Sequence, residues 1–120
     1  MKERPETLSG ETTKYSMCGS LYVTVNTDDK GKPYEVFCNC AKLNTCRSNI
    51  EALARTISKM LQMGYIEEAI GATEKIRCPH MERRKGKNSI TKEKNMETIA
   101  WSCPDAIARE LQKFMKGEKK

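Results

Sequence analysis

Six cysteines are spread over a chain of 120 residues, and their use limits what the chain can fold into. In an oxidising compartment an even count favours disulfides, whereas in a reducing compartment the same count favours metal binding or catalysis. The chain starts Met-Lys-Glu-Arg-Pro-Glu-Thr, without the apolar stretch that directs secretion, so we expect a cytoplasmic protein. No run approaches the roughly 18 apolar residues of a membrane span, so no membrane contact is expected. Metal binding is therefore favoured over disulfides.

The composition is that of one small globular domain, with 38% hydrophobic and 32% charged residues. Runs rich in β-branched and aromatic residues at 21–25 and 34–38 predict two strands, and 12–17 predicts a further one. The sequence between the last two runs, Asn-Thr-Asp-Asp-Lys-Gly-Lys-Pro, has turn chemistry. These features predict a small antiparallel β-meander of two or three strands.

Three helices are expected after the strands. Ser48 and Glu51 fit a capping box that starts the first helix, and Gly64 fits its end. A second helix is predicted over 65–76, with Ile66, Ile70 and Ile76 turned inward. The third opens near Cys103, with Pro104 in its first turn and Asp105 at the positive end of its dipole.

The predicted fold class is thus α+β, a small β-meander packed with about three helices. Residues 1–10 are expected to form an extended lead-in, 11–116 the single domain and 117–120 a basic tail. Residues 80–95 contain Gly86 and no apolar period, which indicates a mobile basic loop within the domain.

Four cysteines fall at the ends of the expected elements, where side chains from distant parts of a chain can converge. They are Cys18, Cys46, Cys78 and Cys103. Four thiolates are the usual ligands of a closed zinc site and also of an iron–sulfur cluster. Because no Cys-x-x-Cys pair is present, the spacing leaves two interpretations open, metal ligands and small buried thiols.

The remaining candidate ligands have simpler interpretations. Cys38 and Cys40 flank Asn39 in a strand pattern, so both side chains should face one side of the sheet, where packing is favoured over a role as ligands. His80 follows Cys78 closely and is interpreted as solvated; replacing a cysteine ligand is the alternative. A Cys–His nucleophilic pair lacks an orienting partner in the sequence.

The net charge of +6 is concentrated in two segments, 79–97 and 113–120. Two solvated segments are the favoured interpretation of these charges. Binding of a phosphate-bearing ligand or a nucleic acid is the alternative, with contacts from Arg83, Arg84, Lys85 and Lys87. The loop lacks the aromatic residues that stack bases of single strands, which counts against nucleic acid there.

The sequence Ser102-Cys103-Pro104-Asp105-Ala106-Ile107-Ala108, together with 19–26, 31–37 and 76–79, resembles the TSCPD domain. This domain occurs at the carboxyl end of many adenosylcobalamin-dependent ribonucleotide reductases and as small stand-alone proteins. The resemblance extends from about residue 10 to 114. It implies metal binding, with zinc as the favoured metal, through Cys18, Cys46, Cys78 and Cys103. The chain departs from the family pattern at Trp101, where the domain's name has threonine, and at Ala41 and Asn44, where glycines are common.

The resemblance implies a non-catalytic accessory module, because 120 residues cannot hold the radical-bearing barrel of a reductase. The expected partner is a protein, such as a ribonucleotide reductase, or a nucleic acid. Two other classes stay open: a nucleotide- or nucleic-acid-binding protein that uses the basic loop, and a thiol redox protein with Cys103 as the attacking thiol. A homo-oligomer also stays open.

Overall fold

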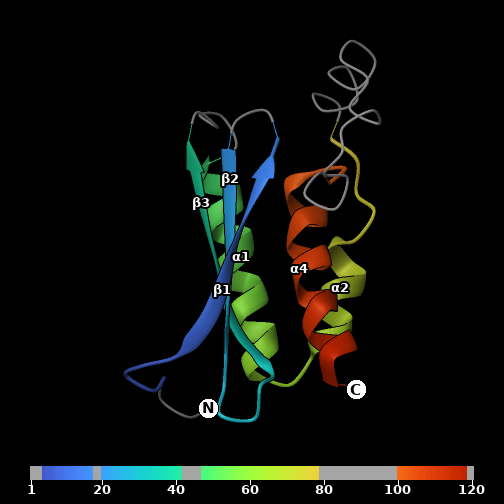
Figure 1. The fold of residues 1–120 in the computed structure, drawn as a ribbon. Coiled ribbons are helices and arrows are strands. Elements are labelled where there is room, and N and C mark those ends of the chain that lie inside the picture. The colour runs from blue at the N-terminus through green and yellow to red at the C-terminus, as the bar shows by residue number, and fades with distance from the viewer. Residues whose placement is uncertain (1–3, 18–19, 42–46, 79–99, 119–120) are drawn as a thin grey trace.

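The structure, a computed structural model, describes residues 4–17, 20–41, 47–78 and 100–118. The elements in these segments are β1 (Ser9–Ser16), β2 (Ser20–Thr27), β3 (Pro33–Ala41), α1 (Arg47–Gln62), α2 (Ile66–Thr73) and α4 (Cys103–Glu118). The strands form one antiparallel sheet in the order β1-β2-β3, and the helices of the described segments lie beside it (Figure 1). The predicted α+β class, a β-meander packed with about three helices, is confirmed. None of the helices in these segments is long and apolar enough to cross a membrane.

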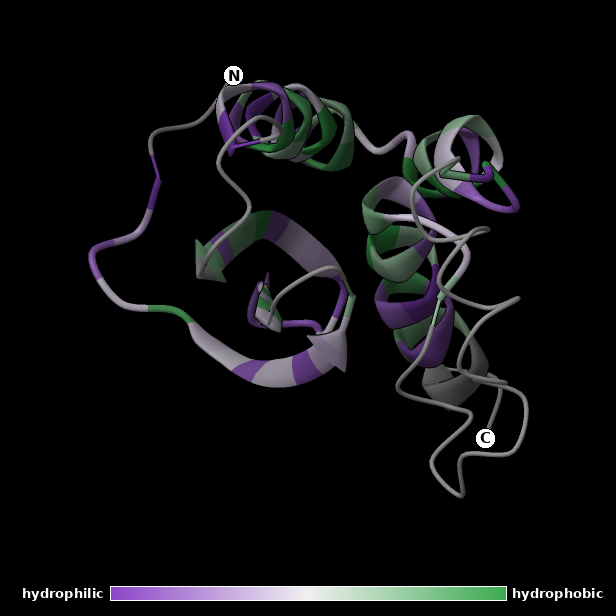
Figure 2. Ribbon diagram, turned by 90° about the horizontal axis from the view of Figure 1, so that it is seen from above, coloured by the Kyte–Doolittle hydropathy of each residue, from purple (hydrophilic) through white to green (hydrophobic). Residues whose placement is uncertain are grey.

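The strands alternate between a buried and an exposed face, as the period of two requires. On β2, Leu21, Val23 and Val25 are fully buried, whereas Tyr22 between them is exposed. On β3, Val36 is buried opposite Val25, and the next residue, Phe37, is exposed. The helices therefore cover one face of the sheet. Figure 2 shows them along two sides of the strands, with no helix on the opposite side.

Helix α1 covers β3 with a stripe at helical spacing, namely Ile50, Ala54, Ile57 and Leu61. It starts at Arg47, so Ser48 lies in its first turn and the prediction that Ser48 caps the helix is wrong by two positions. Its predicted end at Gly64 is confirmed. Gly64 has a φ of 90°, and the Gly64 and Tyr65 N–H groups donate to the Leu61 and Met60 carbonyls, the bond pattern of a Schellman motif.

Helix α2 ends earlier than predicted. It stops at Thr73, Glu74 is extended, and Lys75 has a φ of 63°. As a consequence Ile76 is 44% exposed, and the expectation that it faces inward is wrong, whereas Ile70 is buried as predicted.

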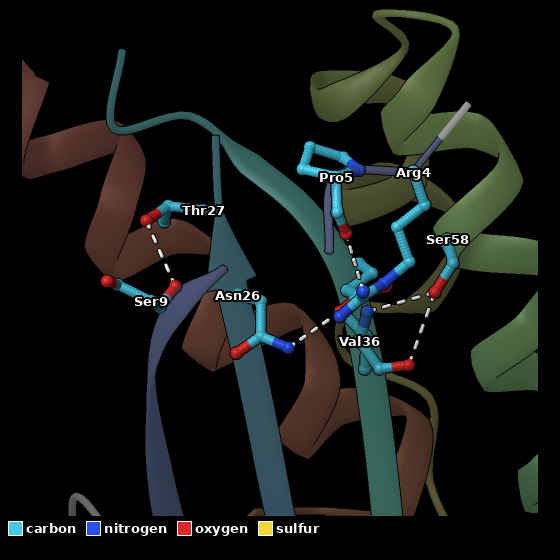
Figure 3. A network of polar contacts seen from close by, with 8 residues as sticks. Arg4, Pro5, Ser9, Asn26, Thr27, Val36 and Ser58 are labelled. Atoms are coloured by element: carbon cyan, nitrogen blue, oxygen red, sulfur yellow. Dashed lines mark hydrogen bonds and ion pairs between the residues drawn. The ribbon is translucent and has the colours of Figure 1, made fainter. Parts of the chain in front are cut away.

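The free edge of β3 is covered by α1. The Ser58 hydroxyl accepts a hydrogen bond from the Val36 N–H at 2.9 Å and donates one to the Val36 carbonyl at 3.2 Å (Figure 3). One serine thus satisfies both backbone groups of a residue on the outer strand of the described sheet. This edge is closed to pairing with another strand at Val36.

The segment before β1 is fastened to the sheet by a buried carboxylate. Glu35 is 4% exposed, and it accepts two bonds from the Arg4 guanidinium, at 2.9 and 2.8 Å, and one from Asn26 at 2.7 Å. Figure 3 shows the Arg4 and Asn26 side chains converging. The hydrogen bond from Arg4 holds the pKa of Glu35 below its usual value, against the effect of burial. Residues 4–8 are therefore held against the sheet before β1 begins at Ser9.

A second buried carboxylate joins the sheet to α4. Glu110 is 1% exposed and accepts hydrogen bonds from the Tyr15 hydroxyl at 2.5 Å and the Thr13 hydroxyl at 2.9 Å. Lys113 forms an ion pair with it at 2.9 Å. Burial, and then the bond to Glu110, raise the pKa of Tyr15 far above its usual value. Three partners thus compensate for the desolvation of this carboxylate.

Candidate metal centre

Two of the four predicted metal ligands lie in the described residues, and the structure brings their chain segments together. Cys103 is the first residue of α4. The Cys78 N–H donates a hydrogen bond to the Trp101 carbonyl at 3.1 Å, so the segment after α2 runs beside the segment that leads into α4. Both cysteines are half-buried and pack against the core. Cys78 and Cys103, distant in sequence, thus lie on neighbouring segments.

This site is at one end of the molecule. Strands β1 and β3 end there, and β2, α1 and α4 begin there (Figure 1). Cys18 and Cys46 lie outside the described residues, as do His80, Arg83, Arg84, Lys85 and Lys87. Cys18 is flanked by two described residues at this end of the sheet. Met17 directly follows β1, and Ser20 is the first residue of β2.

The N-terminus of α4, the helix that carries Cys103, is capped by a side chain. The Ser102 hydroxyl accepts a hydrogen bond from the Asp105 N–H at 3.1 Å, which caps the first turn. Cys103 therefore lies where the partial positive charge of the helix favours a thiolate. The donor chemistry at this end, a thiol at a helix N-terminus and a second thiol on the neighbouring segment, fits a thiophilic metal such as zinc.

The Asp105 carboxylate, which is 3% exposed, connects three segments around this helix start. Its Oδ1 accepts from the Lys75 N–H at 2.7 Å, and its Oδ2 accepts from the Trp101 N–H at 3.0 Å and from Arg109 Nε at 2.9 Å. The sequence interpretation assigned Asp105 to the helix dipole alone. Its larger role is to hold the residues after α2 and before α4 in fixed positions.

Trp101, where the family name has threonine, contributes an aromatic contact beside the site. The guanidinium carbon of Arg77 lies 4.7 Å from the centre of the Trp101 ring, which is a cation–π geometry. Since Arg77 precedes Cys78 and Trp101 stands two residues before Cys103, this contact joins the same two segments as the Cys78–Trp101 backbone bond.

Cys38 and Cys40 face the core, as their spacing predicts. Cys38 lies opposite Val23 and Cys40 opposite Leu21, both on the buried face. Burial raises the pKa of the Cys38 thiol to about 12, with smaller contributions from Cys40 and Cys103. The contribution from Cys103 indicates that the Cys38 thiol lies near the start of α4. Sequence reasoning missed this proximity, because strand alternation gives the face of a residue but not the helix packed on it.

The described residues do not by themselves complete a metal centre. Within 4–17, 20–41, 47–78 and 100–118, no group of three or more histidine, cysteine, aspartate or glutamate side chains is arranged to hold a metal ion. Since half of the predicted ligand set lies outside these segments, the four-cysteine site stays a prediction.

A family model for the TSCPD domain matches residues 1–115 of the 120-residue chain. The chain belongs to the TSCPD domain family. The TSCPD domain is related to the C-terminal domain of ribonucleotide reductases. No curated protein and no solved structure matches the chain.

A hollow at the other end of this TSCPD domain is lined by none of the cysteines. Its volume is about 890 Å³, and it lies between the segment before β1, the β2–β3 turn and the α1–α2 connection. Pro5, Leu8, Tyr34 and Ile66 contribute apolar surface, and the charged lining residues are Asp28, Asp29, Lys30 and Lys32. The hollow and the cysteines therefore occupy opposite ends of the fold.

We expect the Cys38 thiol of this TSCPD domain to react slowly with alkylating reagents. Raising its pKa from 9.0 to about 12 lowers the thiolate fraction at pH 8 by about a thousandfold, and the thiolate is the species that reacts. Iodoacetamide labelling of as-purified protein, followed by peptide mass spectrometry, should show this slow reaction at Cys38. The control is the same residue in urea-unfolded protein. Rates within tenfold of each other in the two states would contradict the burial of Cys38.

Proposed function

We propose that the chain is a non-catalytic module that binds one zinc ion through Cys18, Cys46, Cys78 and Cys103, and that it acts by binding a partner macromolecule. The observation that carries the proposal is the position of Cys78 and Cys103. They come from segments on either side of residues 79–99, and one backbone bond and one aromatic contact hold these segments together. The segments that contain the other two cysteines join elements at the same end of the sheet.

The donor set favours zinc. Four cysteine thiolates form a closed tetrahedral site in which no position is left for a substrate, so such a site is structural. An iron–sulfur cluster uses the same ligands and is the alternative metal group. When bound, zinc supplies cross-links between the start of β2, the start of α1, the segment after α2 and the start of α4. Metal binding would then contribute directly to the free energy of folding.

The shared ancestry with the reductase C-terminal domain supports a partner-binding role. The chain is far smaller than a reductase, and the described elements form one sheet with helices at its side rather than a barrel. A ribonucleotide reductase or a related protein is the first partner to test. The basic residues Arg83, Arg84, Lys85 and Lys87 stay a prediction for contacts with phosphate groups.

Elemental analysis of protein purified without an affinity tag tests whether the protein binds a metal and which metal it is. We expect about one zinc per chain and about four thiols that become reactive only after chelation. Cys103→Ser should lose the zinc, whereas the matched Cys38→Ala should keep it, since Cys38 is not among the proposed ligands. Thermal unfolding should occur at a lower temperature after chelation.

Two outcomes would change the proposal. Iron with an equal amount of sulfide would keep the ligands but replace the structural role with electron transfer or sensing. Protein without metal, in which both Cys78 and Cys103 react freely before chelation, would show that the thiols are not ligands.

A further inference from the structure

One face of the sheet carries no helix in the described part of the chain. Strand β1 is in front of α1 in Figure 1, and in Figure 2 no described helix lies on the side of the strands away from α1 and α4. We call this surface the open face, and its members are the outward side chains of Thr12, Lys14, Tyr22, Thr24, Phe37 and Asn39.

Two aromatic rings are the unusual feature of the open face. Phe37 is 54% exposed and Tyr22 is 37% exposed, although large apolar side chains are normally placed in a core. The register pairs Tyr22 with Asn39 and Thr24 with Phe37, so the two aromatic residues are diagonal neighbours on adjacent strands. At this separation, roughly 7–8 Å between their positions, the rings form one surface across β2 and β3.

The polar groups beside the rings are hydrogen-bonding groups rather than charged pairs. The Thr12 and Thr24 hydroxyls lie 2.7 Å apart across β1 and β2, and the Asn39 side chain is exposed opposite Tyr22. Hydroxyl and amide groups can both donate to and accept from the edges of bases. The open face therefore combines flat apolar surface with groups suited to heterocycles.

The charge of the open face favours an anion. Lys14 lies opposite Tyr22 in the register and is exposed. The strands contain two carboxylates, Glu11 and Glu35. Glu11 pairs with Val25 on the other face, and Glu35 is buried and neutralised by Arg4. Phosphate groups approaching the open face would thus meet a lysine and no unpaired strand carboxylate.

We propose that the open face binds single-stranded nucleic acid, with bases stacked on Tyr22 and Phe37 and a phosphate near Lys14. Aromatic residues on an exposed sheet with a cationic neighbour are the combination that binds single strands with little sequence preference. This inference names the partner class of the proposed module and rests on its partner-binding role. It does not depend on the metal, because none of the cysteines among the described residues belongs to the open face.

Fluorescence anisotropy with labelled oligo(dT) and oligo(U) of about 12 nucleotides tests the proposal on the full chain. Tyr22→Ala and Phe37→Ala should each weaken binding by between about five- and a hundredfold, whereas Tyr22→Phe should retain it. The matched control is Tyr65→Ala, because Tyr65 is an exposed tyrosine, at 48%, in the α1–α2 connection and not on a strand. Far-UV circular dichroism should show the same fold in all variants, since the substituted rings are exposed.

The dependence of the binding constant on salt concentration tests whether Lys14 contacts a phosphate group. Lys14→Gln should lower the slope of log K against log salt by about 1, and the exposed Lys59 in the last turn of α1 is the matched control as Lys59→Gln. Equal slopes for Lys14→Gln and Lys59→Gln would overturn the placement of phosphate at Lys14.

Three further outcomes would overturn the proposal. Binding that is unchanged in Tyr22→Ala and Phe37→Ala would place the nucleic acid elsewhere on the chain. No binding at about 50 mM salt would exclude single strands as the partner. Self-association that is lost in both variants would assign the open face to a second copy of the chain. Zinc content measured on the same samples separates failure of this proposal from failure of the metal site.

Discussion

Replacing Asp105 with asparagine is expected to lower the free energy of unfolding by about 1–3 kcal/mol, because a buried donor left without its acceptor costs about that much. Both carboxylate oxygens of Asp105 accept bonds from backbone N–H groups. An asparagine amide has one acceptor oxygen, so either Lys75 or Trp101 would have its N–H directed at another donor. Urea unfolding followed by far-UV circular dichroism measures the change.

Two variants separate the backbone bonds from the ion pair. Arg109→Gln removes only the ion pair between Arg109 Nε and Asp105 Oδ2, which is 2.9 Å long. Because the Arg109 side chain is 35% exposed, we expect the free energy of unfolding to fall by at most about 1 kcal/mol. Asp29→Asn, in the exposed β2–β3 turn, should change stability by less than about 0.5 kcal/mol. If Asp105→Asn costs no more than Arg109→Gln, the anchoring of Lys75 and Trp101 is not what stabilises this region.

Glu110→Ala is expected to cost about 3–5 kcal/mol, because it opens a cavity in the core and leaves the buried Tyr15 hydroxyl without its acceptor. Tyr15→Phe should cost less, since it removes one of three partners and leaves Thr13 and Lys113 bound to the carboxylate. The same urea titration applies to each variant.

The double variant of Tyr15→Phe and Glu110→Ala tests the link between the sheet and α4. Because the hydroxyl that Glu110→Ala orphans is absent in the double variant, its cost should be below the sum of the single costs by about 0.5–3 kcal/mol. Glu68→Ala, an exposed carboxylate in the first turn of α2, is the control and should cost less than about 1 kcal/mol. Additive costs would mean that Tyr15 and Glu110 do not act together.

The strands and the long helices were predictable because local rules specify them. Alternation on β2 gives the buried face, and Gly64 ends α1 because its φ of 90° suits a residue without a side chain. The end of α2 was not predictable from local rules. Lys75 adopts a positive φ while its N–H is bonded to Asp105, a residue 30 positions away, and no neighbouring residue signals that bond.

The buried carboxylates show the same limit. The spacing of Ile107 and Leu111 predicts the inner face of α4, but Glu110 between them looks like a solvent-facing charge. It is buried because Tyr15 and Thr13 on β1, 95 and 97 residues earlier, supply its partners. In the candidate site, the positions of Cys78 and Cys103 were predictable, because both residues fall at the ends of predicted elements. The proximity of Cys38 to Cys103 depends on how α4 packs on the sheet, which sequence patterns do not specify.

The two described ends of the chain have a practical consequence for probing this protein. Arg4 is held at the end of the sheet where β3 begins. Helix α4 starts at Cys103 and ends at Glu118, and its rise separates these two residues by about 22 Å. A fluorophore, an affinity handle or a fused protein joined near either position would therefore sit far from the thiols. Attachments of this kind can report on binding at the cysteine end without competing with it.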